Sequence, residues 1–439
     1  MAQRDSKTAA RRILQETLAA IDIPAAIARR LDGNAVFPLL PELHNFREIV
    51  AIAYGKAAVA MAQGFQAAVG TRAGAVPVRG ILVRPEAASS APVLPGWQEF
   101  VGGHPVPTTE SFAAGRAILE RLAQCDEKSL VVFLISGGGS SMVEAPLDAG
   151  VSIPDFQALH GALVTCGAPI EEINVVRKHL SATKGGRLAL AAPRAKKLTL
   201  AVSDVPGGYE SALASGPTLP DPTTVADAEQ VIARYGLLDK LPAAIREMFV
   251  HRRLQETPKE GDAAFANAIF ETLLGEHDLV HRSHHCCEAE GIFCMADEQT
   301  DGWPLEKAAD ELLMQLEALQ RDYPGKRVAI LAGGELSCPV TGDGCGGRNS
   351  AFVLTCVPKI AGKKITVLSA GTDGIDGNSP AAGAVADGET LGRAEAAGMD
   401  WKEYMKRSEA YNFFMKLEDA IVTGPTGNNL RDLRILISG

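Results

Sequence analysis

The clearest candidates for chemistry in this chain lie in a loop of three consecutive glycines flanked by serines. Six residues make up the loop: Ser136, Gly137, Gly138, Gly139, Ser140 and Ser141. The apolar run 130–135 before it predicts a fully buried parallel strand. Glycines let backbone N–H groups converge on an anion, and serine hydroxyls add donors. The loop predicts a phosphate site, with a tight turn as the alternative, and it lacks the lysine of a GxxxxGK[ST] loop.

Other polar loops follow apolar runs where strands are expected to end. Their chemistry-bearing members are Lys56, Asp204, Gly334, Glu335 and Asp373. Because the carboxyl ends of parallel strands share one edge of a sheet, we expect these loops to converge. Lys56 follows a buried strand, where a cation needs a negative partner unless it is simply exposed. Asp204 and Asp373 suit Mg²⁺, with helix caps or turns as the alternative.

A basic segment offers further cations. We predict a helix from Glu171 through Leu190, on which Arg177 and Lys184 are seven residues apart and share one face. A basic helical face is usually just solvated. The two glycines after Lys184 make a contact with substrate or phosphate an equal alternative.

Two other patterns carry less weight. Glycines within 341–349 match GxGxxG, but Pro339 breaks the apolar run that should precede a dinucleotide loop. Arg348, at the start of the next helix, is better interpreted as a fork for carboxylate or phosphate. The histidines and cysteines of 281–294 have the spacing of metal ligands, yet a helix end followed by a strand with buried cysteines explains them better.

Composition and charge limit the function classes. The chain has 439 residues, 46% hydrophobic content and a net charge of −10, which argues against nucleic acid or an anionic membrane surface as partner. No apolar run approaches the roughly 18–20 residues that span a bilayer, and the first 21 residues lack the apolar core of a signal peptide. Eight cysteines without a CxxC do not indicate a disulfide framework. We therefore expect a cytoplasmic enzyme.

Strands and helices alternate along most of the chain, which predicts βαβ units and a mainly parallel sheet. The length favours two domains. We place the boundary near 245, within a charged helical stretch from about Thr224 to Leu254, so that the domains are 1–245 and 246–439. The final segment, about 419–439, is predicted to form a strand pair that packs back near the active site.

The ordered motifs resemble those of the glycerate 2-kinases, whose C-terminal portion is the MOFRL domain. They include IAYGKA, ISGGGSS, INVVRKHLSATKGG, SDVPGG, GGELSCPVTGDGCGGRN, GTDGIDG and TGPTGNNLRD, and they cover nearly the whole chain. The resemblance implies a Rossmann-like N-terminal domain, a smaller α/β MOFRL-type domain and an active site in the cleft between them. It implies transfer of phosphate from ATP to D-glycerate with Mg²⁺, giving 2-phosphoglycerate, and leaves a homodimer open. Lys56, Arg348 and Asp204 fall on the catalytic motif positions, and Asp204 on that of the metal ligand.

The resemblance also assigns a nucleotide side and shows departures from the usual motifs. The loop 136–141, Lys184, Gly334, Glu335 and Asp373 are the expected nucleotide-binding residues. Some positions differ from the family's pattern: Gly208, Ser350 and Ala351, and Asn378-Ser379-Pro380. These changes leave open which hydroxy acid is used. The alternatives are an NAD(P)H-dependent hydroxypyruvate reductase, a kinase of a related hydroxy acid, and a small-molecule sensor.

Overall fold

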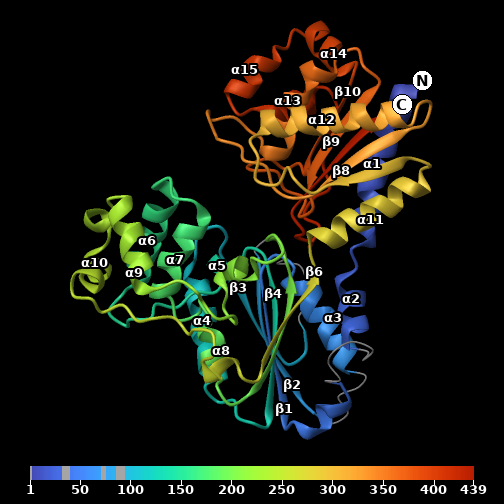
Figure 1. Ribbon diagram of the computed structural model, residues 1–439. Coiled ribbons are helices and arrows are strands. Elements are labelled where there is room, and N and C mark those ends of the chain that lie inside the picture. The colour runs from blue at the N-terminus through green and yellow to red at the C-terminus, as the bar shows by residue number, and fades with distance from the viewer. Residues whose placement is uncertain (1, 32–39, 71–75, 86–93) are drawn as a thin grey trace. The chain divides into compact units, whose positions relative to one another are not determined.

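Two β-sheets organise the computed structural model, which describes residues 2–31, 40–70, 76–85 and 94–439 (Figure 1). The chain divides into two compact units. The parallel-sheet unit is Ile23–Leu274, and the mixed-sheet unit combines Met1–Asp22 with Gly275–Gly439. None of the helices in the described part of the chain has the length and apolar character needed to cross a membrane.

The parallel-sheet unit is built on six described strands in the order β3-β2-β1-β4-β5-β6, all parallel. Their bounds in that order are Trp97–Gly102, Val78–Pro85, Glu48–Tyr54, Ser129–Ser136, Lys196–Val202 and Ala268–Leu274. This is the strand order of the Rossmann fold, whose direction reverses between the first and fourth strands. Every residue of β4 is buried, as expected for a central strand covered on both faces.

Helices cover both faces of this sheet. On one face α4 (Thr109–Leu122) and α8 (Arg187–Leu190) pack on alternate residues of β1 and β4. The other face carries α2 (Ile23–Leu31) and α3 (Ala58–Gly70) (Figure 1). A cluster with its own apolar core lies beside the sheet and contains four helices: α6 (Ile153–Thr165), α7 (Ile170–Leu180), α9 (Val225–Arg234) and α10 (Ala243–Val250).

The sheet of the mixed-sheet unit has the order β11-β10-β9-β12-β8-β7 among its described strands. Their bounds in that order are Ala420–Ile421, Gly383–Asp387, Ile365–Gly371, Asp432–Ser438, Val328–Ala332 and Phe293–Asp297. The closing strand β12 is antiparallel to both β8 and β9 and lies between them. The prediction of a mainly parallel sheet is therefore wrong for this half of the chain. The buried run 432–437 lies in the middle of the sheet and is antiparallel to both of its neighbours.

Helices also cover both faces of the second sheet. One face carries α12 (Leu305–Asp322), α13 (Arg348–Ile360) and α16 (Ala410–Lys416), and α14 (Thr390–Ala396) and α15 (Trp401–Lys406) pack around them. The other face carries α11 (Glu276–Ala289) and the N-terminal helix α1 (Ala2–Ala20). Lys7 ties α1 to this unit, because its Nζ lies 2.8 Å from Asp419 and 3.3 Å from Asp387.

The α/β class, with a parallel Rossmann-like domain and a smaller second α/β domain, is confirmed. The division differs from the expected boundary near 245. Strand β6 pairs with β5 and keeps the chain to Leu274 in the parallel-sheet unit, whereas α1 packs in the other unit. The long helix expected over 171–190 is wrong. The helix ends at Leu180 because Ser181 takes an extended conformation, and Gly185 and Gly186, with φ values of 55° and 81°, separate it from α8.

Candidate functional site

Lys56 and the glycine loop lie side by side at the carboxyl edge of the parallel sheet. Register places Tyr54 of β1 opposite Ile135 of β4. Beyond this pair the Lys56 backbone N–H donates to the Gly137 carbonyl at 2.9 Å, and the Ala57 N–H donates to Ser136 Oγ at 2.9 Å. Strands β1 and β4 flank the point where the strand order reverses, which is where open α/β sheets bind ligands.

The glycine loop needs glycine where it passes the neighbouring side chains. Gly138 has φ 80°, and a Cβ there would lie 3.0 Å from the His104 ring and 3.3 Å from Lys56 Cγ. A Cβ on Gly139 would lie 2.9 Å from the Tyr54 ring. The loop therefore runs close against Lys56 and His104, with its backbone unshielded by side chains of its own.

A chain of hydrogen bonds connects the glycine loop to the cluster of helices beside the sheet. Ser140 Oγ lies 2.8 Å from Ser215 Oγ, and the Ser215 hydroxyl donates to Asn174 Oδ1 at 3.1 Å. Ala214 and Ser215 adopt φ values of 48° and 62°, a left-handed conformation that is uncommon for non-glycine residues. Sequence reasoning missed Asn174 and Ser215, because nothing local in the sequence distinguishes them.

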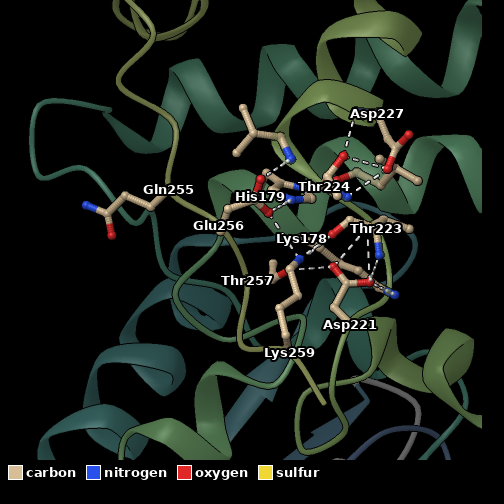
Figure 2. Close-up of polar contacts among 12 residues, drawn as sticks. Lys178, His179, Asp221, Thr223, Thr224, Asp227, Gln255, Glu256, Thr257 and Lys259 are labelled. Carbon is tan, nitrogen blue, oxygen red and sulfur yellow. Dashed lines mark hydrogen bonds and ion pairs between the residues drawn. The ribbon is translucent and has the colours of Figure 1, made fainter. Parts of the chain in front are cut away.

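Arg177 and Lys178 lie in the last turn of α7 and take different partners. Arg177 Nη2 lies 3.0 Å from His160 Nδ1. Lys178 Nζ lies 3.2 Å from the buried Asp221 carboxylate, which also accepts hydrogen bonds from Thr223 and Thr257 (Figure 2). Burial acts to raise the pKa of Asp221, but Lys178 and these hydrogen bonds lower it overall. The network fixes the last turn of α7 and with it the place of Arg177.

Lys184 lies in the interior. Its side chain is 1% exposed, and Nζ donates to Glu144 Oε2 at 2.6 Å and to the Val143 carbonyl at 3.3 Å. Burial lowers the pKa of Lys184, and Glu144 opposes that shift. Because its ammonium is enclosed by these oxygens, we leave Lys184 out of the proposed nucleotide site and assign it to a buried ion pair.

Replacing Lys184 with methionine is expected to lower the free energy of unfolding by about 3–5 kcal/mol, because Glu144 would be buried without its partner. Urea denaturation of the variant measures this loss. The double variant Lys184→Met, Glu144→Gln should recover part of it, since no unpaired charge remains. A single variant of unchanged stability and weakened ATP binding would instead restore Lys184 to the nucleotide site.

Asp204 follows β5 at the same sheet edge. Val202 at the end of β5 lies opposite Ser136, the first residue of the glycine loop. The half-buried Asp204 follows two residues after Val202. Mg²⁺ in nucleotide sites is commonly held by one or two carboxylates together with substrate phosphates, and a single carboxylate here fits that pattern. Within the described ranges, no group of three or more His, Cys, Asp or Glu side chains is placed to hold a metal. The histidines and cysteines of 281–294, all of them described, form no such group.

Arg348 starts α13 in the mixed-sheet unit and is held by two carboxylates. Its Nε and Nη2 donate to the two oxygens of Asp432 at 2.6 and 3.1 Å, and Nη2 lies 2.9 Å from Glu335. Burial acts to lower the pKa of Arg348, but Asp432 and Glu335 raise it overall. Sequence reasoning missed Asp432 as a partner, although it lies in the motif TGPTGNNLRD.

The loop after β8 is tied to two further arginines. Asp301 accepts the Glu335 backbone N–H at 2.8 Å and pairs with Arg431 at 2.7 Å. The Gly334 carbonyl accepts from Arg434 Nη1 at 3.2 Å. Gly334 and Glu335 are thereby placed next to the Arg348 pair.

Asp376, rather than Asp373, caps the helix that carries Arg348. Its carboxylate accepts the backbone N–H groups of Asn349 and Ser350 at 2.9 and 2.8 Å, and burial raises its pKa. Asp373 lies in the loop after β9, where its Oδ1 accepts the Ile375 N–H at 3.0 Å. One departure from the usual motifs, Ser350, has a local role here, because its hydroxyl donates to Asp376 at 2.6 Å.

The structure thus brings the predicted residues together in two sets, each within its own unit. In the parallel-sheet unit the set is Lys56, the loop 136–141 and Asp204. In the mixed-sheet unit the set is Gly334, Glu335, Arg348 and, on the neighbouring strand end, Asp373.

Comparison with known proteins decides the family. Residues 9–250 match a domain of unknown function, DUF4147, and residues 328–432 match the MOFRL family. A D-glycerate 2-kinase of Thermotoga maritima is 36% identical over 413 residues, which cover 92% of this chain and 94% of the relative. The chain belongs to the glycerate 2-kinase family.

A solved structure agrees with this assignment at the level of fold, and a further sequence relative carries another name. The crystal structure of a glycerate kinase from Thermotoga maritima superposes with a TM-score of 0.84 at 32% identity and covers 99% of this chain and 100% of its own. A protein of Agrobacterium vitis, provisionally named a hydroxypyruvate reductase, is 38% identical over 94% of this chain and 92% of its own length. Among glycerate 2-kinase family members, therefore, both names occur at similar identity.

Proposed function

We propose that this chain phosphorylates D-glycerate to 2-phosphoglycerate with ATP as the phosphate donor and Mg²⁺ as the accompanying cation. The carrying observation is the adjacency of Lys56 and the glycine loop at the reversal point of a Rossmann-type sheet. Membership of the glycerate 2-kinase family supports the substrate and the donor.

Phosphoryl transfer depends mainly on positioning and on neutralising charge that spreads over the transferring oxygens. The loop 136–141 offers backbone N–H groups to the nucleotide phosphates, assisted by Ser140 and Ser141. Lys56 supplies the cation that the loop itself lacks and contacts the transferring group. Arg348 provides a second cation, held in orientation by Asp432 and Glu335.

The remaining proposed residues belong to the nucleotide and its metal. Gly334 and Asp373 lie on the nucleotide side, and Glu335 acts there through Arg348. Asp204 would hold Mg²⁺ that arrives with ATP, and the ion supplies charge neutralisation at the phosphates. Gly208 leaves this loop without a second carboxylate, which fits an ion bound largely by phosphate.

The reductase alternative has weaker support. Its local signal is GxGxxG in 342–347, but strand β8 ends at Ala332 and does not lead into this segment. Cβ atoms on Gly342 and Gly344 would both collide with the Arg407 backbone. These glycines therefore serve close packing against the end of α15.

The deciding assay incubates the purified protein with D-glycerate, ATP and Mg²⁺ and, separately, with hydroxypyruvate and NADH. We expect ADP release in the first mixture and no NADH oxidation in the second. ³¹P NMR of the product should show phosphate on the 2-hydroxyl. NADH oxidation without ADP release would replace the kinase by the reductase, and neither reaction would favour a sensor. Light scattering of the same preparation tests the homodimer.

A further inference from the structure

Arg177 is a buried cation that has no carboxylate partner in the part of the chain that the structure describes. Its residue is 8% exposed, and among the described residues no acidic side chain pairs with it, whereas its neighbours Lys178 and Lys184 pair with Asp221 and Glu144. Its Nε has no hydrogen-bond partner within the described ranges. Burying a guanidinium in this way is costly unless an anion compensates its charge.

His160 does not provide that compensation. Burial, Arg177 and Lys184 lower the pKa of His160 to about 4, with a smaller contribution from His104 and an opposing hydrogen bond to the backbone of Pro105. At neutral pH the imidazole is therefore uncharged, and a ring nitrogen can accept the hydrogen bond from Arg177 Nη2. His160 holds the guanidinium in place while leaving its charge unneutralised.

Glu144 is an acidic group that influences the pKa of Arg177, but its carboxylate is already hydrogen-bonded to other groups. It acts to raise the pKa of Arg177, although burial lowers that pKa overall. Its oxygens accept from Lys184 Nζ, from the Ser181 hydroxyl and from the Ala145 backbone N–H. The Glu144 carboxylate thus neutralises the charge of Lys184, and the charge of Arg177 remains uncompensated.

Helical spacing directs Arg177 toward the glycine loop. Arg177 and Asn174 are three residues apart on α7 and lie next to each other on its surface. Asn174 reaches Ser140 of the loop through Ser215, with contacts of 3.1 and 2.8 Å. The uncompensated guanidinium is therefore on the side of the helix from which the phosphate-binding elements are reached.

We propose that Arg177, positioned by His160, binds the carboxylate of the hydroxy-acid substrate and so selects acids over neutral alcohols. The inference rests on the proposed function and adds a specificity residue to it. A guanidinium can bind a carboxylate through two parallel hydrogen bonds, which an ammonium cannot do. A nucleotide phosphate offers the same oxygen chemistry, so the two sources of the anion must be separated by experiment.

The test compares Arg177→Met and Arg177→Lys with wild type in steady-state kinetics. Loss of a hydrogen bond to a charged group predicts a rise in KM for D-glycerate of about 10- to 100-fold, with KM for ATP unchanged. The ratio of kcat/KM for D-glycerate to that for glycerol should fall by a similar factor in Arg177→Met. Arg116→Met, an exposed arginine on α4, is the matched control and should leave all these values unchanged.

Several outcomes would overturn the inference. KM for D-glycerate within twofold of wild type would do so, and a rise confined to KM for ATP would assign the anion to nucleotide phosphate. Thermal melting of both variants establishes whether they fold. If Arg177→Met does not fold, the kinetics of Arg177→Lys decide whether Arg177 binds the substrate carboxylate. Calorimetric titration of D-glycerate without nucleotide separates this inference from the proposed function, because lost binding in the variants supports Arg177 even if wild type shows no turnover.

Discussion

Alanine in place of Lys56 should lower kcat for glycerate phosphorylation by about 100-fold or more, with little change in thermal stability. A cation aimed at the charge of a transition state typically contributes at least this factor. The half-buried Lys56 adjoins the glycine loop through a 2.9 Å backbone contact to Gly137, and the loop contains no cation of its own. When Lys56 is removed, the phosphoryl group loses the positive charge that we propose lies nearest to it.

The effect is measured by coupling ADP release to NADH oxidation at saturating ATP and D-glycerate. Lys240→Ala is the matched control, because Lys240 is exposed in the same unit, and its kcat should equal that of wild type. Circular dichroism establishes that both variants fold. Turnover of Lys56→Ala within threefold of wild type would remove Lys56 from the reaction.

The placement of Lys56, the glycine loop and Asp204 at one sheet edge was accessible to sequence reasoning because it depends on local pattern. The apolar runs before Lys56 and before Ser136 predict buried strands, and both form β-strands of one parallel sheet. Polar residues directly after such strands must come to the same edge. Lys56, the loop 136–141 and Asp204 therefore follow from periodicity and topology together.

The contacts that orient the site depend on tertiary packing. Arg177 meets His160 across two helices, and Lys184 meets Glu144 forty positions earlier in the chain. A basic stretch on a predicted helix does not show which cation is paired and which is not. The left-handed pair Ala214 and Ser215 is equally invisible, because neither residue type favours that conformation.

The mixed-sheet unit shows the same limit at the level of topology. The run 432–438 predicts a strand, but only pairing reveals that β12 enters between β8 and β9 in the opposite direction. That insertion brings Asp432 of the chain's closing motif to Arg348, one of the residues proposed for the site. The N-terminal helix joins this unit through long-range contacts such as the pair of Lys7 with Asp419.

Lysine in place of Arg348 should lower kcat by about 100-fold despite keeping the positive charge. Asp432 accepts from two guanidinium nitrogens at once, at 2.6 and 3.1 Å, and Glu335 holds one of them at 2.9 Å. An ammonium cannot reproduce this planar fork, so its charge would sit elsewhere relative to the reacting phosphate. Asp432→Asn should have a smaller effect in the same direction, because the amide keeps one acceptor for Arg348.

The measurement is kcat at saturating substrates, with thermal melting to establish that each variant folds. Arg321→Lys, an exposed arginine on α12, is the control and should be indistinguishable from wild type. Full activity in Arg348→Lys would mean that the pair with Asp432 serves only the packing of α13 against β12. A loss in Arg348→Lys that exceeds the loss in Asp432→Asn would instead place the guanidinium itself at the transferring phosphate and leave Asp432 as the residue that positions it.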